Sequence, residues 1–345
     1  MIAELRARAP SLAIHVRSNA PHWIFRERDA RAACSGGELE LDPGMLQPNG
    51  LDLDLPATLA AHERFCADWE RHVAREAAFL RELGVGLVVS DIAPLAFAAA
   101  ARAGLPAIGV ANFSWDWILD AYCAREPAWR PIVARYAEAY ATAELLLRLP
   151  LCGEFPAFPR VRDVPLLVHR SRRSREACRR AIGLDPRERR RVVLVSFGGF
   201  GHAALRAAAA DDLHGYLFVS IGAPPAELGA AWQLLPRPAP VPHEDLVQAC
   251  DAVLGKPGYG TVAEVMAHGA RFLHLPREDF REIPVLQSAL RRFGGSRELP
   301  RADFESGRWR GPLDALFAEP APRPCEPADG AAHTALALLE ALQRG

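Results

Sequence analysis

The most informative stretch of this sequence is Leu254-Gly255-Lys256-Pro257-Gly258-Tyr259-Gly260-Thr261-Val262-Ala263-Glu264, in which a short apolar strand leads through a glycine-rich turn into a helix. The N–H groups and the dipole at the start of such a helix attract an anion. Gly258 and Gly260 let the backbone approach a phosphate closely, and Thr261 can cap the helix or donate to a phosphate oxygen. Lys256, the only lysine of the chain, adds positive charge.

Glu264, one turn inside this helix, is placed to accept hydrogen bonds from a ribose diol. The stretch is not a Walker loop, because the order GxxxxGK(S/T) is absent. It is also compatible with an ordinary strand-to-helix turn in which Glu264 is a solvated acid. The pattern therefore predicts an anion site without excluding a purely structural turn.

A second glycine loop follows the strand expected over residues 191–197 and contains Gly198, Gly199 and Gly201. It faces the same edge of the predicted sheet as the first loop, since parallel strands end together. Its GGxG spacing differs from the dinucleotide fingerprint GxGxxG, and no acidic residue closes a strand some 20 positions later. On its own this loop is also compatible with a structural turn.

Polar side chains follow two predicted strands in the first half of the chain. Ser90 and Asp91 end one strand, and Asn112, Ser114 and Asp116 follow the next. Parallel sheets bind ligands outside the carboxyl ends of their strands, so these residues are expected to line the first domain's side of a cleft. Asp91 and Asp116 are candidates for a general base. The alternative makes Asp91 a helix N-cap, Asp116 a surface acid and Asn112 a turn residue.

Strand and helix signals alternate twice along the chain, which predicts two α/β domains with parallel sheets. In the first half, strands are expected at 12–16, 85–90, 105–110 and 144–149, and helices at 1–9, 58–83, 94–103 and 118–143. In the second half, strands are expected at 191–197, 215–220, 252–254 and 271–275, and helices at 203–210, 244–249, 261–268, 284–293 and 330–342. Residues 277–282 follow the last of these strands and belong to the predicted ligand edge. We predict a first domain over 1–160, a second over 161–329 and a C-terminal helix over 330–345 that packs back on the domains.

The composition excludes several classes of protein. Of the 345 residues, 50% are hydrophobic and 24% are charged, so disorder over most of the length is excluded. The 41 basic and 42 acidic residues leave a formal charge of −1, which offers no electrostatic surface for nucleic acid. No apolar stretch approaches the ~20 residues that span a bilayer, so no integral membrane segment is expected. The seven cysteines are scattered singly, which favours reduced thiols and a cytoplasmic location.

Other residues that often carry chemistry show no supporting pattern. The eleven histidines, His243 among them, do not take HExxH or HxH spacing, so they are expected to be core or surface residues, and no metal or cofactor is predicted. No GxSxG elbow supports a Ser/His/Asp triad. The basic runs at residues 170–180 and 187–191 are expected to be solvated faces.

Two Rossmann-like halves, a linker at 150–168, glycine loops in the second half and a returning terminal helix together resemble the GT-B fold of nucleotide-sugar glycosyltransferases. In that fold two Rossmann-like domains with parallel sheets face each other across a cleft. Residues 258–276 are similar to the donor-binding segment of the peptidoglycan N-acetylglucosaminyltransferase and related UDP-sugar enzymes. Residues 89–91, 110–116 and 280–290 are more similar to the glycosyltransferase-like domain at the N-terminus of plant L-arabinokinases and in stand-alone bacterial proteins.

The resemblance implies that a UDP-sugar is the co-substrate and assigns roles to residues of this chain. Those on the donor side are Gly258, Gly260 and Thr261 at the diphosphate with Lys256 assisting, Glu264 at the ribose, Gly198 and Gly199 over the phosphates, and Glu282 or Gln287 near the sugar hydroxyls. Strand-end position, not the resemblance, puts Ser90, Asn112, Ser114 and Asp116 on the acceptor side, with either Asp91 or a group of the missing N-terminal loop as the base. The aspartate–glutamine pair of UDP-sugar enzymes is not intact over residues 278–287, so the donor sugar stays open.

A departure from the family lies at the other end of the chain. The family opens with a strand and a Gly-His-rich loop that faces the acceptor, whereas this sequence starts with what is expected to be the first helix. The first strand of the N-terminal sheet is therefore expected to be missing, which would leave ladder groups near 12–16 and 85–90 unpaired. Two explanations stay open: an upstream start codon, or an inactive relative.

These patterns together predict a metal-independent transferase that moves a hexosyl group from a UDP-sugar to a small-molecule or glycan acceptor. Two other functions stay open. One is a sugar-nucleotide 2-epimerase, which shares this architecture. The other is a module that binds a nucleotide sugar without turning it over.

Overall fold

The computed structural model describes residues 1–26, 29–36, 41–49, 51–197, 213–222, 231–326 and 328–344. The chain forms two compact units. The first contains Met1–Leu46, Asp54–Leu167 and Asp329–Gly345, and the second contains Gln47–Leu53 and Val168–Ala328. The main boundary between the two units therefore lies after Leu167. Residues 47–53 belong to the second unit although they lie in the first half of the sequence. The C-terminal residues 329–345 belong to the first unit.

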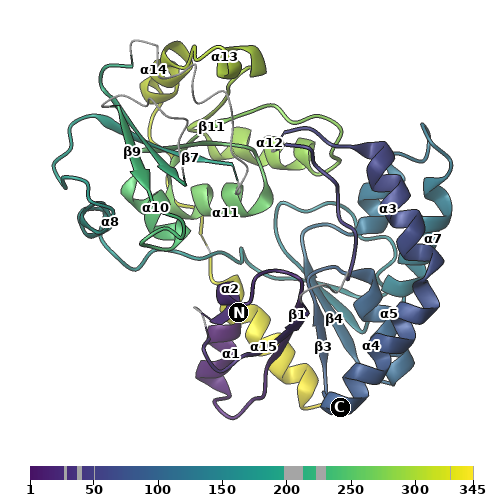
Figure 1. Cartoon of the computed structure of the whole chain (residues 1–345). Helices are drawn as coiled ribbons and strands as arrows, with labels where there is room; N and C mark the ends of the chain where they lie inside the picture. Colours follow the sequence, from purple (N-terminus) through teal and green to yellow (C-terminus); the bar gives the residue numbers. More distant parts are fainter. Residues whose placement is uncertain are drawn as a thin grey trace. The chain divides into compact units, whose positions relative to one another are not determined.

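The first unit is built on a sheet of four parallel strands in the order β3-β4-β5-β6. These strands are β3 (Val88–Ser90), β4 (Ala107–Ala111), β5 (Leu145–Arg148) and β6 (Val161–Asp163). All five residues of β4 are buried, as expected for a strand with neighbours on both sides. Helix α5 (Pro94–Ala103) packs against β3 and β4 and ends at Gly104, which takes the left-handed conformation (φ 75°) that favours glycine (Figure 1).

Two long helices predicted for this unit are each broken into two. The helix predicted over 58–83 is α3 (Leu55–Ala67) followed by α4 (Trp69–Leu83), with Asp68 between them outside helical geometry. Aspartate is a poor residue for a helix interior, because its side chain competes for backbone hydrogen bonds. The helix predicted over 118–143 is α6 (Trp115–Asp120) and α7 (Trp129–Tyr140), separated by a turn that contains Pro127.

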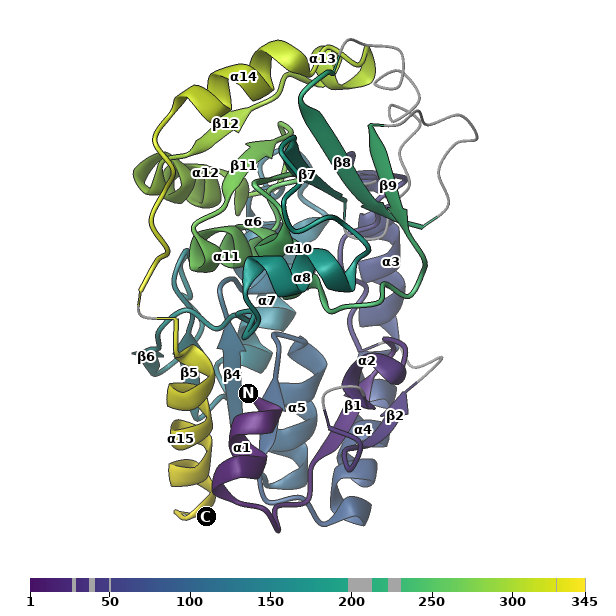
Figure 2. The same cartoon turned by 90° about the vertical axis from the view of Figure 1, so that its left-hand side faces the viewer.

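The N-terminal region forms a separate two-stranded parallel sheet of β1 (His15–Ser18) and β2 (Ala33–Gly36). The prediction that ladder groups near 12–16 would be unpaired was wrong, because β2 pairs with β1; its Ala-Cys-Ser-Gly sequence carries no strand signal. Strand β3 pairs with β4 and, within the described ranges, with no other strand. Helices α1 (Ile2–Arg8) and α2 (Trp23–Arg26) flank β1 in sequence, and α15 (Gly330–Leu342) packs beside α1 (Figure 2).

The second unit contains a sheet of six parallel strands in the order β12-β11-β10-β7-β8-β9. The strands are β7 (Arg191–Ser196), β8 (Tyr216–Ile221), β9 (Trp232–Leu235), β10 (Ala252–Gly255), β11 (Arg271–His274) and β12 (Ser296–Glu298). The helices described in this unit are α8 (Arg175–Ala181), α10 (His243–Ala249), α11 (Tyr259–His268), α12 (Ile283–Phe293), α13 (Arg301–Glu305) and α14 (Arg310–Ala318). The predicted parallel α/β organisation is confirmed, and the helix predicted over 203–210 lies outside the described residues.

The basic run at residues 170–180 is largely exposed, as its composition predicted, but one of its arginines is buried. Arg179 on α8 is only 6% exposed. Its Nε donates to the carbonyl of Ala249 (3.0 Å) and its Nη2 to Asp251 Oδ2 (3.2 Å). The buried guanidinium therefore connects α8 to the end of α10 and to the residue before β10.

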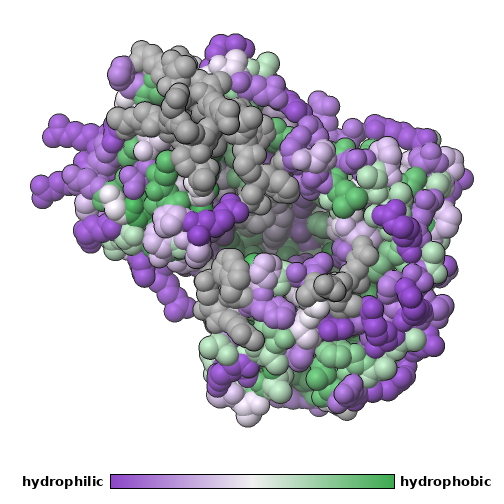
Figure 3. Space-filling view, viewed as in Figure 1, coloured by the Kyte–Doolittle hydropathy of each residue, from purple (hydrophilic) through white to green (hydrophobic). Residues whose placement is uncertain are grey.

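The surface mixes hydrophilic and apolar side chains over each unit on the face shown in Figure 3. Among the residues whose burial the structure describes, the large apolar side chains exposed by more than a third are Ile24, Leu46, Leu83, Val89, Val161, Leu234 and Leu336. They come from different elements, and scattered exposure of this kind is normal for a folded protein.

Strand register places three strand ends of the second unit side by side. Gly255 at the end of β10 is paired with Ser196 of β7 on one side and with His274 of β11 on the other. A Cβ at Gly255 would lie 2.1 Å from the backbone oxygen of Ser196, so only glycine fits. The turn that leads into α11 therefore starts in the middle of the sheet's carboxyl edge.

Candidate functional site

The turn between β10 and α11 has the geometry expected of an anion site. Gly258 precedes the helix in an extended conformation (φ −91°), and no side chain caps the helix start. A Cβ at Gly258 or Gly260 would meet no atom of the described residues within 4 Å, so packing in that part of the chain does not require glycine at either position. α11 has no acidic residue in its first turn, which leaves the positive end of its dipole uncompensated there.

Two positive side chains lie close to this turn. Lys256 follows β10, and its Nζ lies 3.4 Å from Oε1 of Gln47, in the short segment that joins this unit. Burial, and then the nearby charge of Arg277, lower the pKa of Lys256. Arg277 follows β11, with its guanidinium 4.6 Å from the centroid of the Phe280 ring. Two cations close to each other favour a bound anion. In the sequence, the position of Arg277 after a predicted strand was the one indication that it belongs to this site.

Glu264 is connected to two residues that sequence reasoning did not place in the site. Its Oε2 accepts a hydrogen bond from Nδ1 of His243 (2.5 Å), and Nε2 of His243 lies 3.0 Å from Oγ of Ser196. His243 begins α10 and Ser196 ends β7, so the chain of contacts joins three elements. His243 is half-buried, and the sequence pattern did not predict its contacts with Glu264 and Ser196. The three side chains form a Ser–His–acid arrangement, which no GxSxG sequence predicted.

The electrostatics of His243 follow from its neighbours. Burial is the largest single influence and lowers the pKa of His243, but the hydrogen bond and charge of Glu264, together with the charge of Glu244, outweigh it. The net result is a raised pKa. The side chains of His243 and Glu264 are 32% and 16% exposed, so solvent reaches both partners.

The other predicted donor residues are placed as follows. Thr261 lies inside the first turn of α11, so it does not cap the helix; Gly258 occupies that position. Glu282 is 4% exposed and precedes α12. Gln287 on α12 donates from Nε2 to Glu298 Oε2 on the edge strand β12 (3.2 Å). Gly198 and Gly199 lie outside the described residues.

In the first unit, Asp91 follows β3 next to a strained residue. Ile92 has φ 64°, a left-handed conformation that is rare for a β-branched side chain. The buried phenol of Tyr140 donates to the carbonyl of Ile92 (2.8 Å) and accepts from the N–H of Trp115 (3.3 Å), so it ties together the two loops that follow β3 and β4. Backbone strain of this kind concentrates at functional sites.

The environment of Asp91 fits neither a cap nor a fully buried acid. The residue before α5 is Ala93, and no side chain caps that helix, so the N-cap alternative for Asp91 was wrong. Burial raises the pKa of Asp91, but the residue is exposed by surface area, so we expect the effect on its carboxyl to be small. The Ser90 hydroxyl donates to the carbonyl of Ala93 (3.2 Å) and closes the turn.

The polar residues that follow β4 are buried. Asn112, Ser114 and Asp116 are 7%, 0% and 4% exposed, so the reading of Asp116 as a surface acid was wrong. Burial raises the pKa of Asp116, against the effect of hydrogen bonds from Ser114 and backbone N–H groups. Within the described residues, Oδ1 of Asp116 has no hydrogen-bond partner. The carbonyl of Asn112 accepts from the N–H of Gly153 (3.0 Å), which joins the segment after β4 to a part of the chain that is distant in sequence.

Comparison with known proteins identifies the fold. No protein-family model matches the chain. Over 299 residues it is 33% identical to L-arabinokinase of Arabidopsis thaliana, a match that covers 86% of this chain and 28% of that protein. The chain thus spans little more than a quarter of the relative's length. The calicheamicin glycosyltransferase CalG4 superposes with a TM-score of 0.66 at 18% identity, over 99% of this chain and 94% of the other. The chain has the GT-B fold.

Two plant proteins show the same GT-B architecture. A UDP-glucosyltransferase from Polygonum tinctorium capable of glucosylating indoxyl matches with a TM-score of 0.61 at 16% identity, covering 100% of this chain and 95% of the other. The UGT2 of Phytolacca americana, solved with UDP-2fluoro-glucose and pterostilbene, matches with a TM-score of 0.60 at 13% identity, covering 100% and 94%. The predicted resemblance to GT-B glycosyltransferases and to plant L-arabinokinase is confirmed.

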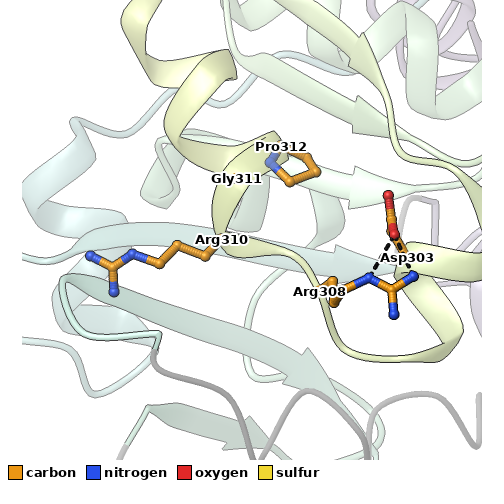
Figure 4. Close-up of a pocket in the computed structure, with 5 residues that line it drawn as sticks. All are labelled: Asp303, Arg308, Arg310, Gly311 and Pro312. Carbon is orange, nitrogen blue, oxygen red and sulfur yellow. Dashed lines mark hydrogen bonds and ion pairs between the residues drawn. The ribbon is translucent and has the colours of Figure 1, made fainter.

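Three further observations bear on the chemistry available to this GT-B chain. Among the described residues, no cluster of three or more His, Cys, Asp or Glu side chains could hold a metal ion. In the same part of the chain, no helix combines the length and apolar character needed to cross a bilayer. A cavity of about 330 Å³ near α13 and α14 is lined by Asp303, Arg308, Arg310, Gly311 and Pro312 (Figure 4). Arg308 is bonded there to Asp303 (2.7 Å), and none of the predicted site residues lines it.

Proposed function

We propose that this protein transfers a hexosyl group from a UDP-sugar to a hydroxyl group of a small-molecule or glycan acceptor, without a metal ion. The observation that carries the proposal is the open glycine turn at the start of α11, with Lys256 and Arg277 beside it and Glu264 one turn further on. The glycosyltransferases that share the GT-B fold, one of them solved with UDP-2fluoro-glucose, support the choice of donor.

In this proposal the donor diphosphate binds at the turn. The backbone N–H groups around Gly258 and Gly260 donate to its oxygens, and Lys256 and Arg277 balance its charge. When the bond between the anomeric carbon and the diphosphate breaks, negative charge develops on the leaving oxygen. Preorganised N–H groups and cations stabilise that charge in place of a divalent ion.

In this proposal Glu264 binds the ribose of the donor. Its Oε2 is held by His243, and within the described residues no hydrogen bond occupies Oε1, which can accept from a ribose hydroxyl. A hydrogen bond to a charged group contributes about 1.5–3 kcal/mol, so losing it weakens binding by about 10- to 100-fold. Glu282 and Gln287 remain our candidates for contacts with the sugar hydroxyls.

The first unit supplies the acceptor side. Asp91 takes the proton from the acceptor hydroxyl as that oxygen bonds to the anomeric carbon. Ser90, Asn112, Ser114 and Asp116 shape the surroundings of the acceptor, and the strained backbone at Ile92 holds the carboxylate of Asp91 in place. We also propose a cytoplasmic location, since all seven cysteines are free thiols.

Calorimetric titration with UDP and a panel of UDP-sugars tests the donor site. We expect binding by the wild-type protein and a 10- to 100-fold loss in Glu264→Gln. Glu82→Gln on α4, an exposed glutamate of the other unit, is the matched control and should bind like the wild type. The absence of any UDP or UDP-sugar binding, or equal binding by Glu264→Gln, would contradict the proposal.

Turnover assays then separate the remaining functions. Release of UDP that depends on an added acceptor supports the transferase. Conversion of UDP-GlcNAc without any acceptor indicates a 2-epimerase. Tight binding with neither reaction indicates a module that binds a nucleotide sugar.

A further inference from the structure

The contacts around His243 connect an acid to a hydroxyl at the carboxyl edge of the second sheet. Nδ1 of His243 lies 2.5 Å from Glu264 Oε2, and Nε2 lies 3.0 Å from Ser196 Oγ. Ser196 is paired in register with Gly255, the last residue before the glycine turn. The hydroxyl of Ser196 therefore lies at the same strand edge as the proposed diphosphate site.

The protonation of His243 decides what the Ser196 hydroxyl can do. A carboxylate only accepts hydrogen bonds, so we assign the hydrogen on Nδ1 to the contact with Glu264 in both states of the ring. In the neutral ring, Nε2 is an acceptor, and the Ser196 hydroxyl must turn its hydrogen toward it. In the protonated ring, Nε2 donates to Ser196 Oγ, which leaves the hydroxyl hydrogen available to another acceptor.

The charged groups that face His243 favour the protonated ring. Glu264 on α11 contacts it directly, and Glu244 on its own helix adds negative charge. Asp245, the next residue of α10, is engaged elsewhere, with Ser171 Oγ at 2.6 Å and Arg173 at 3.5 Å. From β7 the ring meets the uncharged Ser196.

Two arginines of helix α8, which also packs against α10, are bonded to groups other than this ring. Arg175 bonds to the Cys250 carbonyl, and Arg179 to the Ala249 carbonyl and Asp251. Burial opposes protonation, but the two glutamates outweigh it and the pKa of His243 is raised. In the described part of the chain, no cation is paired with Glu264 other than His243 itself.

We propose that His243 is a positioning residue for the donor diphosphate: the nucleotide binds with the ring protonated, so that binding takes up one proton wherever the free ring is neutral, and the Ser196 hydroxyl then donates to a diphosphate oxygen. The proposal rests on the proposed function, and it adds Ser196 to the anion site. No covalent bond changes. The proton comes from the solvent and is held at Nε2, where it is shared with Ser196 Oγ. The imidazolium also places a positive charge near the anion.

Calorimetric titration with UDP in two buffers of different ionisation enthalpy measures the proton uptake directly. On the alkaline side of the His243 titration, the wild-type protein should take up close to one more proton per UDP than His243→Gln. Protons that UDP itself takes up are the same for both proteins and do not affect this difference. Over the same range the wild-type affinity should fall by up to about tenfold per pH unit, while that of His243→Gln should stay nearly flat. His333→Gln is the matched control, because His333 is an exposed histidine beside an acid, Asp329 (3.4 Å), in the other unit.

A second variant keeps the test independent of any folding defect in His243→Gln. Ser196→Ala retains the titrating histidine and should bind UDP about tenfold more weakly, because one hydrogen bond to a charged oxygen is lost. Equal proton uptake by the wild type and His243→Gln, or unchanged affinity in Ser196→Ala, overturns the inference while the donor site stands. Absence of UDP binding by the wild type overturns both proposals.

Discussion

Replacing Gly260 by alanine separates protein stability from ligand binding at the proposed anion site. Gly260 lies in the first turn of α11, is exposed, and does not have a positive φ. A Cβ there would meet no atom within 4 Å in the part of the chain that the structure describes. Alanine is the better helix former by up to about 1 kcal/mol, so Gly260→Ala should leave the free energy of unfolding unchanged or raise it by that amount.

The same methyl group should weaken binding, because it occupies the space through which a diphosphate reaches the backbone N–H groups. Losing one charge-assisted hydrogen bond costs about 1.5–3 kcal/mol, which corresponds to a roughly 10- to 100-fold weaker affinity for UDP. Urea unfolding measures the stability and calorimetric titration measures the affinity. A Gly260→Ala protein that is as stable as the wild type and binds UDP equally well would refute the placement of the diphosphate.

Gly255, which ends the strand before this turn, is a glycine that the fold itself requires. Its Cβ would lie 2.1 Å from the Ser196 backbone oxygen, so Gly255→Ala forces two paired strands apart. We expect a loss of about 1–3 kcal/mol in the free energy of unfolding. Comparison of the two variants distinguishes a glycine required by the fold from one that leaves room for a ligand.

Three further outcomes follow from named contacts. His62 is fully buried, donates from Nε2 to the Gly44 carbonyl (3.0 Å), and has a pKa that burial lowers to about 4. Because the unfolded chain binds the proton first, the free energy of unfolding should fall by about 3 kcal/mol as the pH drops from 6.5 toward 4. Urea unfolding at several pH values measures this loss, which should be much smaller in His62→Gln. Tyr140→Phe removes the hydroxyl bonded to the Ile92 carbonyl and the Trp115 N–H and should cost about 1–3 kcal/mol in urea unfolding, with a lower transfer rate but unchanged UDP affinity. Lys256→Met should weaken UDP binding about tenfold in calorimetry, and Lys256→Arg should bind nearly as well as the wild type. Equal UDP affinity of Lys256→Met and the wild type would instead indicate that Lys256 only contacts Gln47.

Much of the fold and part of the site were determined by local sequence. Alternating apolar strands and helical periodicity specify parallel sheets, because strand and helix periods are properties of a few consecutive residues. The glycine turn before α11 and its Glu264 were visible for the same reason. Short polar strands were not visible, since β2 and β12 acquire their structure only by pairing with a neighbour.

The composition of the site depended on tertiary structure. Ser196, His243 and Glu264 are separated by 47 and 21 residues, and strand register together with helix packing brings them within hydrogen-bond distance. Lys256 and Arg277 likewise meet because β10 and β11 are adjacent in the sheet. Leu51 lies in the core of the second unit, although the chain before residue 47 and after residue 53 belongs to the first. Such contacts join residues that are remote in sequence, and no local pattern encodes the distance between them.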